Sequence, residues 1–344
     1  MAANDKMPPV AVSMGDPAGI GLDIVIAALH GAQKQALASF VLIADPLVLQ
    51  QRAAQLGCAV PVTVLSDGAP ELIAPAGTLG IVSVPCAAPV IAGAPNAANA
   101  AATIASIERA ARLVKDGRAS ALLTNPIAKS VLVATGFTHP GHTEFLGELA
   151  ARYWNTQVQP VMMLVSADLK VVPVTLHIPL ASVPRQLTRE LIVTTARTAA
   201  RALITDFGIA KPRLAICGLN PHAGEEGLMG SEERTIISPA IDELRQAGLA
   251  VTGPHPADTL FHAAARTKYD AVLAMYHDQA LIPLKTIAFD TGVNVTLGLP
   301  FVRTSPDHGT AFDIAGSGRA SPASFAAALA MASAIARQRT GQVA

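Results

Sequence analysis

The chain has 344 residues, of which 51% are hydrophobic and 15% charged, and its 25 basic and 25 acidic residues give a net charge of zero. This length allows one large or two ordinary domains with a sizeable core, and no segment has the composition of a disordered region. A net charge of zero argues against the basic surface with which proteins bind nucleic acid or anionic membranes, so we expect neither as a partner.

Short apolar runs alternate with segments of helical periodicity along the chain. The predicted strands are residues 9–13, 40–45, 79–84, 120–125, 160–166, 170–176, 213–220, 271–276 and 293–297. The predicted helices are residues 97–117, 187–208, 231–248 and 324–339. Such alternation is typical of an α/β fold with a largely parallel sheet.

The cysteines Cys58, Cys86 and Cys217 are odd in number and scattered, without a CxxC pair. This pattern predicts no disulfide framework and favours a reducing compartment, so we expect a cytoplasmic protein. The N-terminal MAANDKMPPV has no apolar segment of the secretory type. The Ala-rich residues 324–339 are too short to span a membrane, and we expect a packed C-terminal helix.

The segment MGDPAGIG, residues 14–21, follows the first predicted strand. A ligand-binding turn is expected at this place in an α/β fold. The segment is not GxGxxG, and the chain has no Walker A sequence, so a nucleotide bound here would use neither fingerprint. A tight turn that merely requires glycine is the alternative.

Three of the nine histidines, His177, His222 and His277, lie just beyond the ends of predicted strands. Open α/β sheets bind ligands outside the carboxyl ends of their strands, so these imidazoles could converge on one divalent metal ion. The alternative is that each histidine is structural. No close pair such as HExxH is present, and the spacing alone does not decide between the two.

Other polar side chains lie at similar places. His142 and Thr143 begin a predicted helix in GHTEFL, where free backbone N–H groups favour an anion. Lys129 and Arg303 follow predicted strands and would suit a phosphate or carboxylate, although each could equally be a surface charge. Asp258, in PADTLF, is a candidate general base.

Together, these motifs resemble the 4-hydroxythreonine-4-phosphate dehydrogenase family of vitamin B6 biosynthesis. The resemblance runs from about residue 10 to residue 335, through GDPAGIG, GHTEFL, NPHAGEEGLMG, PADTLF, AMYHDQALIPLK and GVNVTLGLPFVRTSPDHGTAFDIAG. It implies an isocitrate/isopropylmalate dehydrogenase-like α/β fold, with two α/β domains and a cleft between them. We expect residues 1–130 and 286–344 to form the first domain, with both termini and the cofactor loop. Residues 131–285 would form the second, with the metal ligands and the dimer interface.

The resemblance also implies which residues form the site. The implied metal ligands, contributed across a homodimer whose subunits share each active site, are His177, His222 and His277. The implied substrate contacts are His142, Thr143, Lys285, Asn294 and Arg303. The implied catalytic side chains are Asp258 and Lys285. The implied cofactor residues are Gly15, Asp16, His308, Gly309, Thr310 and Asp313. Beside His277, the side chains of Asp278 and Gln279 would either orient the histidine or cap the strand end.

The implied activity is the oxidation and decarboxylation of 4-phosphohydroxy-L-threonine to 3-amino-2-oxopropyl phosphate, with NAD or NADP and one divalent metal ion, Zn, Mg or Co. DHGTAFDIAGSGRASP is similar to the adenine-side cofactor loop of isopropylmalate dehydrogenases, which would explain how NAD binds without a Rossmann motif. The nearest alternative is a paralogue acting on D-threonate or D-erythronate 4-phosphate. The intact GHTE and FVRTSPDHGTA segments argue against a branch acting on dihydrodiol dicarboxylates. An acyltransferase for acyl phosphates and a catalytically inactive ligand-binding module are more distant alternatives.

Overall fold

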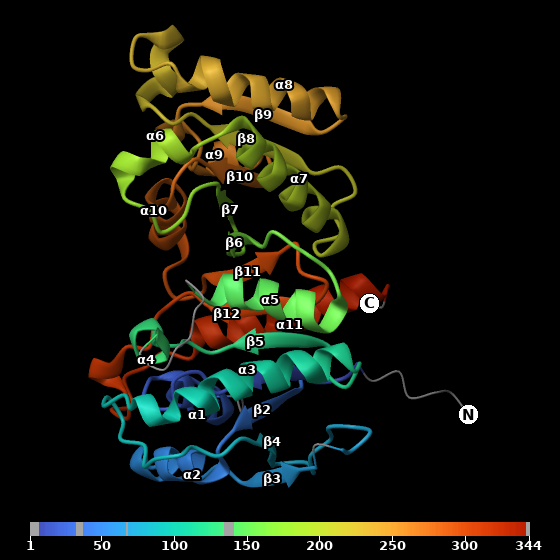
Figure 1. The fold of residues 1–344 in the computed structure, drawn as a ribbon, viewed down its shortest axis with the longest axis vertical. Helices are drawn as coiled ribbons and strands as arrows, with labels where there is room; N and C mark the ends of the chain where they lie inside the picture. The colour runs from blue at the N-terminus through green and yellow to red at the C-terminus, as the bar shows by residue number, and fades with distance from the viewer. Residues whose placement is uncertain (1–6, 32–36, 67, 134–140, 342–344) are drawn as a thin grey trace. The chain divides into compact units, whose positions relative to one another are not determined.

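The computed structural model describes residues 7–31, 37–66, 68–133 and 141–341. The chain forms two compact units (Figure 1). Unit 1 consists of Met1–Pro160 and Leu299–Ala344, and unit 2 of Val161–Gly298. Within the described residues, no helix is both long enough and apolar enough to span a membrane.

Unit 1 is built on parallel strands in the order β3-β4-β2-β1-β5-β12. Its strands are β1 (Val10–Ser13), β2 (Phe40–Ala44), β3 (Val62–Leu65), β4 (Leu79–Ser83), β5 (Ala121–Thr124) and β12 (Arg303–Pro306). Its helices are α1 (Gly21–Gly31), α2 (Pro46–Gln55), α3 (Ala100–Lys115), α4 (Lys129–Val133), α5 (His142–Trp154) and α11 (Ala323–Thr340). All four residues of β1 are buried, and α3 and α11 pack against it.

Unit 2 has the strand order β11-β6-β7-β10-β8-β9. Its strands are β6 (Val161–Val165), β7 (Lys170–Pro173), β8 (Arg213–Cys217), β9 (Ala250–His255), β10 (Ala271–Ala274) and β11 (Val293–Leu297). Its helices are α6 (Val183–Gln186), α7 (Arg189–Thr205), α8 (Ser238–Gln246), α9 (Ala263–Arg266) and α10 (His277–Ala288). The pairs β7·β10, β10·β8 and β8·β9 are parallel, whereas β6 is antiparallel to both of its neighbours.

All nine predicted strands and all four predicted helices are confirmed, with ends that differ by a few residues. The expected largely parallel sheet is also confirmed, except around β6. There the chain turns back within a short connection, in which Ser166 N–H donates to Leu169 O at 2.8 Å. A connection this short can join only antiparallel strands, because a parallel pair needs a crossover of a dozen or more residues.

The boundaries between the units lie further along the chain than the expected 130 and 285. Helix α5 packs against α3, and Arg152 Nη1 donates to Glu108 Oε1 at 2.7 Å, so the segment before Pro160 belongs to unit 1. Strand β11 pairs with β6 from Val293↔Val165 to Leu297↔Val161, so the chain up to Gly298 belongs to unit 2.

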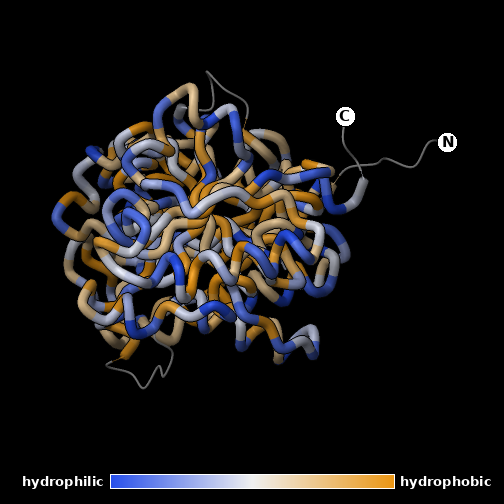
Figure 2. The backbone as a smooth tube through the Cα atoms, turned by 90° about the horizontal axis from the view of Figure 1, so that it is seen from above, coloured by the Kyte–Doolittle hydropathy of each residue, from blue (hydrophilic) through white to orange (hydrophobic). Residues whose placement is uncertain are grey.

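The apolar strands form the interior of each unit, and the polar segments of the chain lie mostly on outer helices and loops (Figure 2). In unit 1, one polar side chain aligns the strand ends. Ser106 of α3 accepts a hydrogen bond from Met14 N at 2.8 Å and donates to Ile43 O at 2.6 Å. The carboxyl ends of β1 and β2 are therefore fixed at one edge of the sheet, where loops of α/β proteins bind ligands.

Candidate functional site

Unit 1 contains a buried guanidinium, that of Arg303, the first residue of β12. Its side chain is only 3% exposed, and its Nε and Nη2 donate to Thr124 Oγ1 at 3.2 and 2.6 Å. Thr124 ends β5, which runs parallel to β12. Burial lowers the pKa of Arg303 to about 9, so the side chain remains charged at neutral pH.

His142 and Thr143 are the first residues of α5, a helix of 13 residues whose N-cap is Gly141. The pKa of His142 is well below its usual value because the imidazole is desolvated and because the positive charge of Arg303 is near. The imidazole is therefore neutral at pH 7, and its buried Nε2 has no hydrogen-bond partner among the described residues. A cation, an open nitrogen and a helix N-terminus together favour an anionic ligand.

The two segments expected to bind the cofactor meet in unit 1. Asp16 is buried and accepts a hydrogen bond from Ala18 N at 3.0 Å, and burial raises its pKa. Ile20 N–H donates to Thr310 O at 3.0 Å, which joins the turn at 14–21 to the segment after β12. The backbones approach closely at this contact, since a Cβ on Gly19 would lie 3.0 Å from Thr310 O.

The remaining expected cofactor residues lie on the same two segments. Gly15 follows β1 with a φ of 74°, and Asp313 is in the short helix Phe312–Ile314. A Cβ on Gly309 would meet no atom within 4 Å, so there is open space beside its backbone. The Nε2 of His308 is buried and has no hydrogen-bond partner in the described part of the chain. These features fit a ligand that approaches the backbone and offers polar atoms.

In unit 2, His177 and His277 lie side by side. Their ring centroids are 5.7 Å apart. His177 follows β7 with a φ of 49°, and His277 is the first residue of α10. The Nδ1 of His277 lies 2.6 Å from Asp278 Oδ1. A carboxylate on one ring nitrogen fixes the tautomer and leaves the other nitrogen for a metal ion.

Gln279 has a different role from its neighbour Asp278. Its Oε1 accepts a hydrogen bond from Met275 N at 2.6 Å, and its Nε2 donates to Gly218 O at 2.8 Å. Gln279 thus caps the end of β10 and ties it to the loop after β8. Of the two roles considered for these side chains, Asp278 contacts the histidine and Gln279 caps the strand.

The third histidine, His222, lies on the loop after β8, and its side chain is 63% exposed. Among the described residues, no three His, Cys, Asp or Glu side chains form a group that could hold a metal ion. A single chain therefore brings His177 and His277 together but does not complete a three-ligand site. Two adjacent imidazoles and an exposed third one are a donor set suited to a divalent transition metal.

No motif in the sequence points to Glu233, which holds the loop of His222. Its side chain is only 6% exposed. Its Oε1 accepts hydrogen bonds from Leu219 N at 2.8 Å and Asn220 N at 2.7 Å, and its Oε2 accepts one from Asn220 Nδ2 at 3.0 Å. The only signal in the sequence is a pair of acids near the start of a predicted helix, which also suits simple helix capping.

The other expected site residues of unit 2 lie on separate elements. Asp258 is in the short helix Ala257–Thr259 after β9. Lys285 is in the last turn of α10, with its Nζ 5.6 Å from the ring centroid of Phe289. Asn294 lies on β11, and its buried Oδ1 has no hydrogen-bond partner among the described residues. In unit 1, Lys129 begins α4.

The chain is similar to known proteins of one enzyme family. Residues 36–332 match the family model described as "Pyridoxal phosphate biosynthetic protein PdxA". The chain is 53% identical over 346 residues to the 4-hydroxythreonine-4-phosphate dehydrogenase of Methylorubrum populi, with 100% of this chain and 98% of that protein covered. It is 52% identical over 326 residues to the enzyme of the same name from Xanthobacter autotrophicus, with 94% and 92% covered.

A solved structure shares the fold. The crystal structure of 4-hydroxythreonine-4-phosphate dehydrogenase from Klebsiella pneumoniae superposes with a TM-score of 0.86 at 38% identity, and the match covers 97% of this chain and 99% of that one. The expected α/β fold is confirmed by this match. By sequence and by structure, the chain belongs to the 4-hydroxythreonine-4-phosphate dehydrogenases, an oxidoreductase family.

Proposed function

We propose that the protein oxidises and decarboxylates 4-phosphohydroxy-L-threonine to 3-amino-2-oxopropyl phosphate, with NAD as the oxidant, in pyridoxal 5′-phosphate biosynthesis. The observation that carries this proposal is the anion site of unit 1, where the buried guanidinium of Arg303 lies near the neutral imidazole of His142. The names of the relatives point to a phosphorylated substrate. The free cysteines Cys58, Cys86 and Cys217 agree with the expected cytoplasmic location.

Arg303, His142 and Thr143 bind the anionic groups of the substrate in this proposal. The guanidinium supplies the charge, and the first turn of α5 supplies backbone N–H groups. Asn294 and Lys285 of unit 2 are the further substrate contacts. The buried Oδ1 of Asn294 is open to a donor on the substrate, and Lys285 supplies a second cation.

His177, His222 and His277 hold one divalent metal ion in this proposal, contributed across a homodimer. The side-by-side rings of His177 and His277 and the exposure of His222 support it. Imidazole ligands favour Zn or Co over Mg. When bound, the metal ion would supply Lewis acidity toward the substrate hydroxyl and toward negative charge during loss of CO2, and the nicotinamide would supply a hydride acceptor.

The chain's own side chains prepare these steps. Asp278 orients the imidazole of His277 through the 2.6 Å contact to its Nδ1. Asp258 and Lys285 are the two candidates for removing the hydroxyl proton, because each has a side chain that can act as a general base. The turn at 14–21 and the segment containing His308, Gly309, Thr310 and Asp313 bind NAD or NADP.

The direct test follows NADH formation by the purified, metal-loaded protein with NAD and either 4-phosphohydroxy-L-threonine or D-threonate 4-phosphate. We expect turnover on the first compound, abolished by His222→Ala. Turnover on the second compound alone would move the protein to the sugar-acid branch of the family. No NADH from either compound, with metal bound, would contradict the proposed chemistry.

A variant separates the anion site from the metal site. Arg303→Glu places a negative charge where the substrate phosphate is proposed to bind, so KM for the substrate should rise steeply. Bound metal, measured by elemental analysis, should stay at the wild-type level. Loss of metal in this variant would count against the assignment of Arg303.

A further inference from the structure

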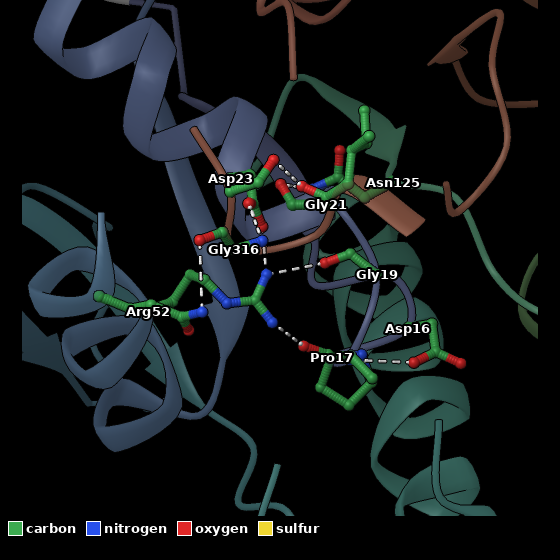
Figure 3. A network of polar contacts seen from close by, with 12 residues as sticks. Asp16, Pro17, Gly19, Gly21, Asp23, Arg52, Asn125 and Gly316 are labelled. Carbon is green, nitrogen blue, oxygen red and sulfur yellow. Dashed lines mark hydrogen bonds and ion pairs between the residues drawn. The ribbon is translucent and has the colours of Figure 1, made fainter. Parts of the chain in front are cut away.

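A buried ion pair links the first two helices of unit 1 (Figure 3). Arg52 lies on α2 and Asp23 in the first turn of α1, and the two side chains are 3% and 2% exposed. Besides its contact with Asp23 Oδ2, the Nη1 of Arg52 donates to Gly19 O at 2.9 Å, and Nη2 donates to Pro17 O at 3.1 Å. The guanidinium therefore holds the backbone of the turn at 14–21 from inside the unit.

The other oxygen of Asp23 reaches a distant segment. Asp23 Oδ1 accepts a hydrogen bond from Gly316 N at 2.6 Å, and Gln55 Nε2 donates to Gly316 O at 3.3 Å. Gly316 has a φ of 71°, and a Cβ there would collide with the Gln55 side chain. The loop that follows Thr310 and Asp313 is thus fastened to α1 and α2.

The hydrogen-bond partners of Arg52 and Asp23 indicate that this ion pair positions two loops and does not only stabilise the fold. A buried ion pair often stabilises a fold no better than apolar side chains of similar volume. Here, however, the groups that the pair binds are main-chain atoms of two loops separated by most of the sequence: Pro17 and Gly19 in one, Gly316 in the other. An apolar pair could fill the space but could not fix these backbone groups relative to each other.

We infer that Arg52 and Asp23 are positioning residues of the dinucleotide site. They set the spacing between the turn at 14–21 and the segment 308–316, the two stretches that carry the proposed cofactor residues. This inference rests on the proposed use of NAD. Arg52 and Asp23 would act on the dinucleotide only through the two loops. Substitutions that break the ion pair should therefore weaken dinucleotide binding and leave substrate binding unchanged.

The test compares Arg52→Met, Arg52→Lys and Asp23→Asn with the wild type. NADH binding to the metal-loaded protein is titrated by fluorescence, and steady-state kinetics give KM for NAD and for the phosphorylated substrate. In Arg52→Met, we expect Kd for NADH and KM for NAD to rise about tenfold or more, because a misplacement of about 1 Å can cost about 100-fold. KM for the substrate and bound metal should stay within about twofold. Arg52→Lys, which keeps the charge but not the planar fork, should lie in between.

The matched control is Leu113→Ala in the last turn of α3, a buried apolar position outside both loops. It should lower the melting temperature and leave NADH binding unchanged. If Arg52→Met and Arg52→Lys bind NADH within twofold of the wild type, the pair is structural only and the inference is overturned. Wild-type protein that turns over substrate with another oxidant and binds no NADH would overturn the proposed cofactor, and the inference with it.

Discussion

The turn at 14–21 in unit 1 and the loop at 218–230 in unit 2 are both held by a buried carboxylate, but in different ways. Asp23 binds the guanidinium of Arg52 and one backbone N–H, whereas Glu233 accepts hydrogen bonds from N–H groups of Leu219 and Asn220. Each carboxylate fixes an irregular backbone that carries proposed site residues. Asp23 joins two loops to each other, whereas Glu233 supports one loop locally.

The backbones of the two loops also differ. In the first, the left-handed conformation falls on a glycine, Gly15, where it costs little. In the second, residues 222–226 are all left-handed, and the non-glycine ones are His222, Ala223, Glu225 and Glu226. Each such residue costs about 1–2 kcal/mol. The first loop is therefore encoded by its own sequence, whereas the second stores strain that contacts such as those of Glu233 must offset.

The largest effect should come from Glu233→Ala. Removing the carboxylate leaves the N–H groups of Leu219 and Asn220 without their acceptor, so we expect about 3 kcal/mol less stability in urea unfolding. Metal affinity, measured by competition with a chromogenic chelator, should fall about 10–100-fold. The matched control is Glu232→Ala, which removes the contacts of Glu232 Oε2 with Asn220 Nδ2 at 2.9 Å and Ser231 N at 3.0 Å. It leaves the hydrogen bonds from Leu219 N and Asn220 N to Glu233 in place. Equal effects of the two variants would contradict the role given to Glu233.

Gly15→Ala should destabilise the turn at 14–21 by steric overlap. A Cβ at this position would lie 2.6 Å from Pro126 O, and its φ of 74° is strained for alanine. We expect a loss of about 2–3 kcal/mol in the free energy of unfolding, together with weaker NADH binding. Chemical denaturation measures the first effect and fluorescence titration the second. Wild-type stability would show that glycine is dispensable there.

Acid should affect stability through the buried histidine of unit 1. The folded-state pKa of His142 lies below its unfolded value of about 6.5, so between the two the unfolded chain binds more protons. The stability contribution is complete above pH 6.5 and is lost as the pH falls below it, by up to about 1.4 kcal/mol per pH unit. Urea midpoints from pH 7.5 to 5 should therefore fall less in His142→Gln. His255, whose pKa burial and Arg245 also lower, acts in the same direction, so His142→Gln with His255→Gln should give the flattest profile.

The smallest expected effect is a gain in stability, from the substitution Ala223→Gly. Ala223→Gly removes the penalty of a left-handed alanine but adds freedom to the unfolded chain, and the two terms leave about 0.5 kcal/mol of extra stability. Differential scanning calorimetry of the metal-free protein detects such a gain as a small rise in melting temperature. A clear fall would mean that residues 222–226 are not strained.

Sequence patterns located most strands because buried parallel strands are continuous apolar runs. Strand β12 was missed because three of its four residues, Arg303, Thr304 and Ser305, are polar, although all four are buried. Strand β3 is half-exposed at the edge of the sheet, and β9 contains a Gly-Pro pair, so neither gives a clear signal. The polar composition of β12 is informative, because a strand that is both buried and polar is expected at a functional site and not in a hydrophobic core.

The proposed site residues were predicted from sequence motifs. The structure adds two supporting residues, Arg52 and Glu233, that no motif reveals. Arg52, in a helix of mixed polarity, has the sequence context of an ordinary surface charge, and only the fold brings it to Pro17 and Gly19. Glu233 likewise acquires its role from the path of the loop after β8. Such contacts join residues far apart in the sequence, so no local pattern could have predicted them.

The most direct test of the proposed chemistry is to measure NADH and CO2 together during turnover of 4-phosphohydroxy-L-threonine by the metal-loaded protein. The account predicts equal amounts of the two products, and loss of both when a chelator removes the metal ion. NADH without CO2 would reduce the activity to a simple oxidation. Full turnover after removal of the metal ion would contradict the role proposed for His177, His222 and His277.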